Sequence, residues 1–372
     1  MENKTRDARC RALDAPPKIS VVVLAYNVEQ YIRACLESLL LQTFENFEII
    51  VVDDGSQDDT PAQIDAAMQA DVRIICVRHK TNLGTFRARL TGAEVARGDY
   101  FCMVDGDDTV DADYLFALHQ LIEQEDCDVS ECAMMAATRN GKVGLVPRSE
   151  LSPRRVTGVK ILHMALMESI WHTASNKLFS RKLYLNAKTL YDAIEDHITV
   201  ADDKLFVLPM LCFARKFART ERILYWYRDR AGSSTRARGE ASNLRHIQST
   251  GCADNHLLRI FQSLRLDKRT YELLEANRRQ EVKRFLRIIG KQPYTSTSRN
   301  LLVSSLVKYY DIESISLELE ICKGFFRGFL RFFVRYSLGS WYRLILRTIR
   351  HTAWGAFPSN RRRVINMMKS QT

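Results

Sequence analysis

The chain lacks several features of secreted and membrane-spanning proteins. Its nine cysteines in 372 residues are odd in number, and no two of them form a Cys-x-x-Cys pair. This scatter argues against a disulfide framework and against a cysteine-rich zinc site, and it favours a reducing compartment. No window reaches the roughly 18 apolar residues that a transmembrane helix requires, and the N-terminus has no apolar signal-peptide core. We therefore expect a cytoplasmic protein whose residues 1–17 form a disordered arm.

Acidic residues are absent from 321–372, a segment that contains eleven Lys and Arg residues. The whole chain has 55 basic and 44 acidic residues, so the first 320 residues are formally neutral and a nucleic-acid partner is not expected. Lys323, Arg327, Arg331 and Arg335 recur every four residues among phenylalanines. The pattern predicts an amphipathic helix at an anionic membrane surface, at the inner face of the cell membrane. The alternative is a helix that packs on the rest of the protein with its arginines in water.

Short β-branched runs alternate with helical apolar spacing in the first hundred residues. The runs are 19–24, 49–52, 72–77 and 100–104, and the helical patterns lie in 31–40, 62–70 and 86–96. Alternation of this kind predicts βαβ units and a mainly parallel sheet. Ligands bind at the carboxyl ends of such strands. Asn27, Asp53 and Asp105 each follow or end a run, so we expect them to converge on one edge.

Three carboxylates, Asp105, Asp107 and Asp108, follow the apolar run that begins at Tyr100. Carboxylates this close repel one another unless a proton or a cation lies between them. Hard oxygen ligands suit Mg²⁺ or Mn²⁺, which commonly hold the phosphates of a nucleotide. The cluster therefore indicates a metal site. The alternative is a solvated acidic turn.

The order of several short motifs resembles that of the family 2 inverting glycosyltransferases, whose catalytic domain has the GT-A fold. The motifs are Ala25-Tyr26-Asn27, Asp53-Asp54-Gly55-Ser56, Asn82-Leu83-Gly84, Ala88-Arg89, Gly98-Asp99-Tyr100 and Asp105-Gly106-Asp107-Asp108. The resemblance implies an α/β fold: a nucleotide-sugar-binding, Rossmann-like mixed sheet flanked by helices, followed by a C-terminal helical region.

The same resemblance implies roles for individual residues. Asp53 or Asp54 would hydrogen-bond the nucleotide base, Asn82 and Arg89 would hold base and ribose, and Asp105 and Asp107 would bind Mn²⁺ or Mg²⁺. Tyr26, Asn27 and Gly106 belong to the same nucleotide-sugar site.

Further motifs lie downstream. Residues 126–136 and 142–146 flank Asn140-Gly141, which predicts a β-hairpin. The segment from Ala174 to Phe179 resembles the start of the family's acceptor-side helix. Asp202 and Asp203 precede an apolar helix, and the resemblance implies that Asp203 is the general base, with the division of labour between the two acids left open. Without the resemblance, the pair reads as an N-cap that serves only its helix.

The stretch from Arg222 to Arg228 and the loop from Gly232 to Thr235 resemble the strand and loop that close over the donor diphosphate. Arg228, Arg230 and Ser233 are the candidates, since guanidinium groups pair well with phosphate oxygens. The alternative is an edge strand followed by a solvated loop. His172 and His197 lie near motif positions, but a lone histidine is more often packed or at the surface, so neither is a site candidate.

These observations predict a catalytic domain over 18–238, a helical extension over 239–320 and a membrane-associating tail over 321–372. The expected activity is the metal-dependent, inverting transfer of a hexosyl or N-acetylhexosaminyl group from a UDP-sugar. The acceptor is expected to be a hydroxyl of a growing surface glycan, and the tail suggests that this glycan is lipid-linked. One alternative is a haloacid-dehalogenase-type phosphatase with Asp105 as nucleophile and Asp107 as acid and base. Another is a catalytically silent, membrane-bound scaffold.

Overall fold

The structure is a computed structural model that describes residues 16–137, 143–145, 154–228, 239–292 and 294–310. The chain divides into two compact units, Met1–Gln280 and Glu281–Thr372. The expectations for the N-terminal arm up to residue 15, for Arg230 and Ser233, and for the tail over 321–372 lie outside the described residues. The sequence-based domain boundaries stay predictions.

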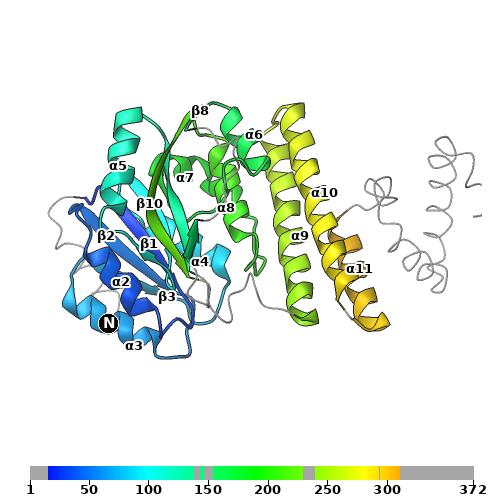
Figure 1. The fold of residues 1–372 in the computed structure, drawn as a ribbon, viewed down its shortest axis with the longest axis horizontal. Helices are drawn as coiled ribbons and strands as arrows, with labels where there is room; N and C mark the ends of the chain where they lie inside the picture. The colour runs from blue at the N-terminus through cyan, green and yellow to red at the C-terminus, as the bar shows by residue number, and fades with distance from the viewer. Residues whose placement is uncertain (1–15, 138–142, 146–153, 229–238, 293, 311–372) are drawn as a thin grey trace, which may run out of the picture. The chain divides into compact units, whose positions relative to one another are not determined.

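In the first unit, the ten strands of the described residues form a single sheet (Figure 1). Its main order is β3-β2-β1-β4-β9-β6-β10-β5, while β7 pairs with β6 and β8 pairs with β10. The strands are β1 (Ile19–Ala25), β2 (Phe47–Asp53), β3 (Ile74–Arg78), β4 (Tyr100–Asp105), β5 (Thr109–Val110), β6 (Val129–Ala137), β7 (Val143–Leu145), β8 (Arg155–Thr157), β9 (Lys177–Ser180) and β10 (Lys216–Arg228).

The parallel part of the sheet confirms the sequence reading. Strand β1 pairs in parallel with β2 and β4, and β2 pairs in parallel with β3. Every residue of β1 is buried, as expected for a strand covered on both faces. Ala25 pairs with Asp53, and Leu24 pairs with Asp105. The polar tips of β1, β2 and β4 therefore meet at one edge.

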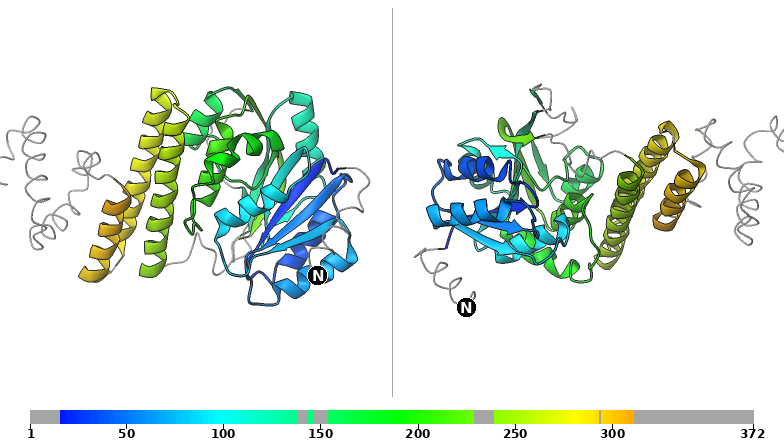
Figure 2. Two further views of the ribbon diagram at one scale, coloured as in Figure 1. Left: turned by 180° about the vertical axis from the view of Figure 1, so that it is seen from behind. Right: turned by 90° about the horizontal axis from the view of Figure 1, so that it is seen from below.

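Helices cover both faces of this sheet (Figures 1 and 2). Odd-numbered residues of β1 and β2, such as Val21 and Ile49, pack with α2 (Ile32–Leu40), α3 (Thr60–Ala70) and α5 (Tyr114–Glu125). Even-numbered residues, such as Val22 and Ile50, belong to a second core. That core includes residues of α4 (Thr85–Val95), α6 (Lys160–Leu166), α7 (Arg181–Ala187) and α8 (Asp202–Leu211). The alternation of side chains along each strand thus produces two cores and three layers.

Helices follow the sheet, as the sequence predicts. After the 3₁₀ turn η1 (Lys188–Leu190) and α8, the chain forms α9 (Glu240–Ser263), α10 (Lys268–Lys291) and, in the second unit, α11 (Ser296–Tyr309). The Tyr271 hydroxyl donates to the Phe261 carbonyl at 2.7 Å, which ties the start of α10 to α9. In the stretches that the structure describes, no helix combines the length and apolar character needed to cross a membrane.

The hairpin prediction is confirmed, and one helix prediction is wrong. Strands β6 and β7 pair antiparallel, with Met135 opposite Leu145, while the Asn140-Gly141 turn lies outside the described residues. The segment Ala174 to Phe179 does not start a helix. Lys177–Ser180 is strand β9, inserted between β4 and β6. Asn176 has a φ of 58°, in the left-handed region, which interrupts a helix at this point.

Candidate functional site

The carboxylate turn after β4 is shaped by Gly106. The Gly106 amide donates to the Leu24 carbonyl at 2.8 Å. A Cβ at this position would lie 2.7 Å from that same oxygen, so only glycine fits. The close approach ties the turn to the end of β1. It also fixes where the side chains of Asp105 and Asp107 begin.

Asp108 is buried at 1% exposure and anchors strand β10. Its Oδ2 accepts from the Tyr225 hydroxyl at 2.7 Å, and its Oδ1 accepts from the Arg228 amide at 2.7 Å. The Asp105 amide also donates to the Tyr225 hydroxyl oxygen at 3.2 Å. Burial, together with the nearby charges of Asp105 and Asp107, raises the pKa of Asp108 well above its usual range. The third acid of the motif therefore connects the turn to β10.

Arg89 links the carboxylate turn to the start of α8. Its Nη2 lies 3.5 Å from Asp105 Oδ1 and 2.8 Å from Asp203 Oδ1. Its Nε donates to Asp202 Oδ2 at 2.9 Å. The guanidinium is buried, with a side chain only 3% exposed. The two acidic motifs, about a hundred residues apart in sequence, thus meet at one cation.

The charges in this group shift each other's pKa values. Burial raises the pKa of Asp105, assisted by the negative charge of Asp203 and opposed by Arg89. Burial likewise raises the pKa of Asp202, to about 6, again against the pull of Arg89. Burial alone would lower the pKa of Arg89, but Asp203, Asp105 and Asp202 raise it above its ordinary value. Acids held together against burial and mutual repulsion are characteristic of functional sites.

Asp202 and Asp203 differ in access to solvent. The Asp202 side chain is 11% exposed, whereas that of Asp203 is 29% exposed. Asp203 Oδ1 accepts from the Ala174 amide at 3.1 Å, in addition to its contact with Arg89. These contacts fix the carboxylate while its side chain stays accessible. Of the two, Asp203 is the more accessible to solvent.

The donor set at the turn fits a hard divalent cation. Asp105 and Asp107 are both partly exposed and lie two residues apart on the turn. Ser175 Oγ donates to Asp105 Oδ2 at 3.3 Å and holds that carboxylate in place. Oxygen ligands from one or two carboxylates are typical of Mg²⁺ and Mn²⁺ sites that also engage phosphates. Burial and, after it, the repulsion of neighbouring carboxylates raise the pKa values of Asp105 and Asp108, and such a cation would offset both effects.

Asp53, Asp54 and Asn27 form the framework of the neighbouring edge. Asp53 Oδ1 accepts from the Ser56 amide at 3.0 Å, and Asn27 Oδ1 accepts from the Gln57 amide at 2.9 Å. Both oxygens of Asp54 are occupied, because they accept from the Leu83 and Gly84 amides at 2.9 and 3.0 Å. Asp54 is 4% exposed, so its carboxylate fixes the loop that carries Asn82.

Histidines hold that loop from two sides. His79 Nδ1 lies 2.6 Å from Asp54 Oδ1, and His197 Nε2 lies 2.8 Å from Asn82 Oδ1. The Phe86 amide donates to the Ile198 carbonyl at 3.2 Å, which brings the segment before α8 against the start of α4. The position of Asn82 therefore depends on a segment more than a hundred residues further along the chain.

Arg228 and Tyr26 are exposed members of the candidate set. Arg228 Nε donates to the Asp107 carbonyl at 3.2 Å, and its guanidinium lies 5.4 Å from the ring centre of Tyr31. The Tyr26 side chain is among the exposed large hydrophobics at 42%. Ser233 and Arg230, the other candidates from the following loop, are outside the described residues.

Sequence reasoning missed Ser175, Tyr225 and the role of His197. Ser175 lies inside the Ala174 to Phe179 motif and Tyr225 inside the stretch from Arg222 to Arg228, but neither motif predicts the contact that its residue makes. A lone histidine such as His197 gives no signal in the sequence for a contact with Asn82. Each of the three contacts joins residues at least 70 positions apart. Only the fold brings these pairs together.

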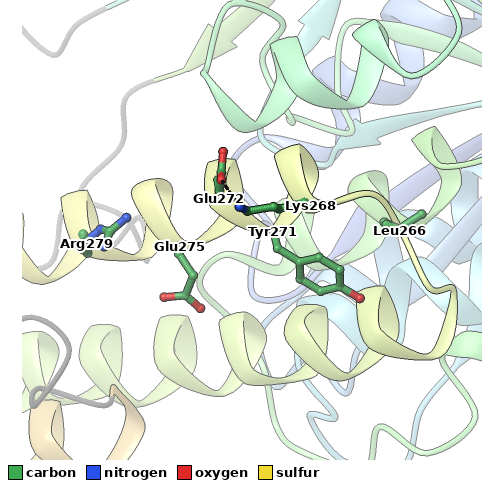
Figure 3. A pocket seen from close by; sticks show the side chains of 6 residues that line it. All are labelled: Leu266, Lys268, Tyr271, Glu272, Glu275 and Arg279. Atoms are coloured by element: carbon green, nitrogen blue, oxygen red, sulfur yellow. Dashed lines mark ion pairs between the residues drawn. The ribbon is translucent and has the colours of Figure 1, made fainter.

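A shallow hollow near the start of α10 contains no candidate residue. It is lined by Leu266, Lys268, Tyr271, Glu272, Glu275 and Arg279 (Figure 3). The Lys268 ammonium lies 3.9 Å from Glu272 across one helical turn. Its lining is that of a charged helix surface, so the site is defined by the carboxylates and not by this hollow.

The chain is similar to known glycosyltransferases. The family model described as Glycosyl transferase family 2 matches residues 20–184. The chain is 31% identical to the uncharacterized glycosyltransferase EpsJ of Bacillus subtilis over 237 residues, which are 62% of this chain and 67% of EpsJ. It is 29% identical to the succinoglycan biosynthesis protein ExoO of Rhizobium meliloti over 255 residues, 67% of this chain and 70% of ExoO.

A solved structure shares the fold. TarS 1-349 of S. aureus in complex with UDP-GlcNAc superposes with a TM-score of 0.51 at 21% identity, covering 80% of this chain and 92% of TarS 1-349. The mixed sheet flanked by helices is that of the GT-A glycosyltransferases, as predicted. The family model matches the segment that carries the carboxylate turn, and EpsJ, at 31% identity, is matched along 67% of its own length. The chain therefore belongs to the family 2 glycosyltransferases and is an enzyme of that class.

Proposed function

We propose that this glycosyltransferase transfers a sugar from a nucleoside diphosphate sugar, with UDP as the expected nucleotide, to an acceptor hydroxyl in a metal-dependent reaction with inversion. One observation carries the proposal. Arg89 Nη2 contacts both Asp105, the candidate metal ligand, and Asp203, the candidate base. The group proposed to serve the leaving diphosphate and the group proposed to serve the attacking hydroxyl are therefore adjacent.

Asp105 and Asp107 would hold Mn²⁺ or Mg²⁺ at the carboxyl edge of β4. A divalent cation there supplies charge neutralisation for the departing nucleoside diphosphate. Arg228, whose Nε is bonded to the Asp107 carbonyl, lies next to this position and adds a second positive charge for the diphosphate. Ser233 would act from the loop that follows.

Asp203 is the proposed general base. Its Oδ1 is held by the Ala174 amide and Arg89, and its second oxygen is proposed to take the proton of the acceptor hydroxyl. The deprotonated oxygen then attacks the anomeric carbon on the face opposite the leaving nucleotide. A single displacement of this kind inverts the configuration at that carbon.

Arg89 is proposed to position the acids. The family resemblance assigns it to base and ribose, but its buried guanidinium contacts Asp105, Asp202 and Asp203. A guanidinium with several fixed donors holds carboxylates in defined directions. Asp202, more buried than Asp203, would then be a partner of Arg89 and not the base.

The nucleotide would lie along the edge formed by β1 and β2. Tyr26 offers an exposed ring for the base, Asn27 holds the loop after β2, and Gly106 shapes the turn after β4. Both oxygens of Asp54 accept from loop amides, whereas Asp53 accepts an amide only at Oδ1; its Oδ2, 3.7 Å from Arg78 Nε, is therefore proposed for the hydrogen bond to the base. Asn82, held by His197, would contact the base or the ribose.

We place this reaction in the assembly of a surface glycan. The matched relative ExoO is named as a succinoglycan biosynthesis protein, which supports polysaccharide assembly as the setting. The basic segment over 321–372 favours a lipid-linked acceptor at the inner face of the cell membrane, because each Lys or Arg near an anionic leaflet contributes roughly 1 kcal/mol. The acceptor is then a glycan that ends in a free hydroxyl.

The test is nucleotide release from a panel of nucleotide sugars with and without Mn²⁺. Asp107→Asn should nearly abolish turnover and weaken nucleotide binding in Mn²⁺, and EDTA should have the same effect on the parent protein. Asp192→Asn is the matched control, because Asp192 is an exposed acid outside the cluster. It should behave as the parent does.

Three outcomes would contradict the proposal. Full activity in EDTA would show that the reaction does not depend on a divalent metal. Release of inorganic phosphate from simple phosphate esters, without sugar transfer, would favour the phosphatase alternative. Retention of configuration in the product, determined by NMR, would exclude a single displacement by the acceptor oxygen with Asp203 as its base.

A further inference from the structure

A nitrogen, a sulfur and an oxygen ligand meet on one face of α9. Cys252 and His256 lie four residues apart on that helix, so their side chains are neighbours. Asp196 comes from the segment before α8. One donor atom of each residue lies within 4.8 Å of those of the other two. His256 Nε2 is 2.7 Å from Asp196 Oδ2.

The surrounding backbone holds this group in place. Ser249 Oγ, on the preceding turns of α9, accepts from the Thr199 and Val200 amides at 3.1 and 3.0 Å. On the other side of Asp196, the Ile194 carbonyl accepts from Arg87 Nη2. The segment that carries Asp196 is therefore fixed at both ends before any ligand arrives.

The three donors suit a transition metal of intermediate softness. Thiolate, imidazole and carboxylate are the ligands of Zn²⁺, whereas Mg²⁺ and Mn²⁺ prefer oxygen alone. Zn²⁺ bonds of about 2.0–2.3 Å in a tetrahedron separate the ligand atoms by roughly 3.3–3.8 Å. Small side-chain adjustments bring the three atoms to that spacing. Asp196 is exposed, so water has access to the fourth position.

We propose that Asp196, Cys252 and His256 form a site for Zn²⁺ or a similar transition metal, separate from the oxygen-only cluster at Asp105 and Asp107. The absence of Cys-x-x-Cys pairs argues against cysteine-rich zinc sites but not against this one, which uses one sulfur. A bound ion would join the segment before α8 to α9. That segment also carries His197, whose Nε2 contacts Asn82. If Asn82 binds the donor as proposed above, the ion also stabilises the donor site.

The binding test uses cobalt as a probe on the full chain after removal of metals with a chelator. Co²⁺ bound to a thiolate gives a ligand-to-metal charge-transfer absorption that carboxylate sites do not give. The parent protein should show this absorption with one ion per chain, and Cys252→Ser and His256→Gln should lose it. Cys212→Ser is the matched control, because Cys212 is also partly buried and lies outside the group. It should bind as the parent does.

Zn²⁺ should displace cobalt and raise the midpoint of thermal unfolding in the parent and in Cys212→Ser, with no rise in Cys252→Ser. Equal cobalt absorption in Cys252→Ser and the parent would overturn the site and indicate an adventitious ion only. Absence of the absorption from both would overturn it because no cobalt is then bound to the Cys252 thiolate. These readouts do not require sugar transfer, so they separate this proposal from the proposed function. A donor affinity that is unchanged when Zn²⁺ is bound would overturn the link to Asn82.

Discussion

Asp202 and Asp203 are neighbours in sequence, yet the fold gives them different surroundings. Arg89 Nε contacts Asp202, and Asp203 is bound by Arg89 Nη2 and the Ala174 amide. The difference in exposure, 11% against 29% for the two side chains, is what favours Asp203 as the base. The assignment leads to a direct test.

Asp203→Asn keeps nearly the same volume but cannot take the acceptor proton. We expect turnover to fall at least ~100-fold, in line with the contribution of a general base. Donor affinity, measured by calorimetry with the nucleotide, should hardly change. If Asp203→Asn keeps most of its activity while Asp202→Asn loses it, the roles of the pair are reversed.

His172 provides a pH-dependent prediction on stability. Its Nδ1 is buried and has no hydrogen-bond partner among the described residues. Burial, reinforced by the ammonium groups of Lys204 and Lys177, lowers the pKa of His172 from 6.5 to about 3. In the unfolded chain the imidazole takes up a proton below its ordinary pKa, while in the folded chain it stays neutral. Lowering the pH from 6.5 toward 3 therefore favours unfolding.

His172→Gln removes this proton uptake, so its free energy of unfolding should depend less on pH in that window. Relative to the parent, the variant should gain at most roughly 2 kcal/mol between about pH 7 and about pH 5. Urea unfolding at the two pH values measures the difference. An identical pH dependence in the two proteins would contradict the shift.

At the scale of elements, α8 is joined to α9 and α10 by one buried cation. Lys204 Nζ lies 2.5 Å from Asp254 Oδ1 and 2.5 Å from Asn277 Oδ1. Asp254 is fully buried at 0% exposure. Because α8 begins with Asp202 and Asp203, this contact connects the helical part of the first unit to the acids of the site.

Lys204→Met should destabilise the protein by about 3–5 kcal/mol, because it leaves the charge of Asp254 buried without its ammonium partner. The free energy of unfolding in urea measures the loss. Adding Asp254→Asn to Lys204→Met should recover part of it, since the buried charge is then gone. A loss below about 1 kcal/mol in the single variant would mean that the contact stabilises the protein no more than a weak surface ion pair does.

The elements that the sequence predicted well are those whose signal is local. Strands β1, β2 and β4 are continuous apolar runs because both of their faces are covered. The segment with Asn176 was misread because its neighbours pack as a strand, Leu178 into one core and Phe179 into the other. The left-handed φ of Asn176 is a property of the turn that no apolar period reveals.

The candidate site could be predicted only in part. Parallel strands bring their ends together, so the convergence of Asn27, Asp53 and Asp105 followed from the sequence. The contacts of Arg89 with Asp203 and of Tyr225 with Asp108 did not, because they join residues more than a hundred positions apart. Such pairings depend on the order of strands and helices in space.

For the whole molecule, the charge distribution leads to a prediction on membrane binding. The eleven basic residues of 321–372, which lie outside the described residues, account for the full net charge of +11. Changing Lys323, Arg327, Arg331 and Arg335 to Gln should reduce sedimentation of the full-length protein with anionic vesicles at low salt. Screening should also weaken binding of the parent, since the Debye length falls from roughly 10 Å at 0.1 M to about 3 Å at 1 M.

The matched control changes four exposed lysines of the first unit, Lys160, Lys182, Lys188 and Lys268, to Gln. It removes the same charge but should leave vesicle binding unchanged. Sedimentation that falls equally in both variants would attribute the effect to net charge alone. If the parent protein does not sediment with anionic vesicles at any salt concentration, the proposed membrane association is wrong.

The position of β10 in the sheet has a consequence for protein synthesis. Tyr225 and Arg228 bind Asp108 from β10, which pairs with β5 and β6 in the sheet, and the bond from Tyr225 spans 117 residues of sequence. A ribosome releases the chain from its N-terminus, so the acidic turn emerges long before the strand that binds it. During that interval the Asp108 carboxylate lacks the Tyr225 hydroxyl and the Arg228 amide that it accepts from in the folded protein. The centre is therefore completed late in translation, and a nascent chain that ends before β10 has the acids of the enzyme without the strand that orders them.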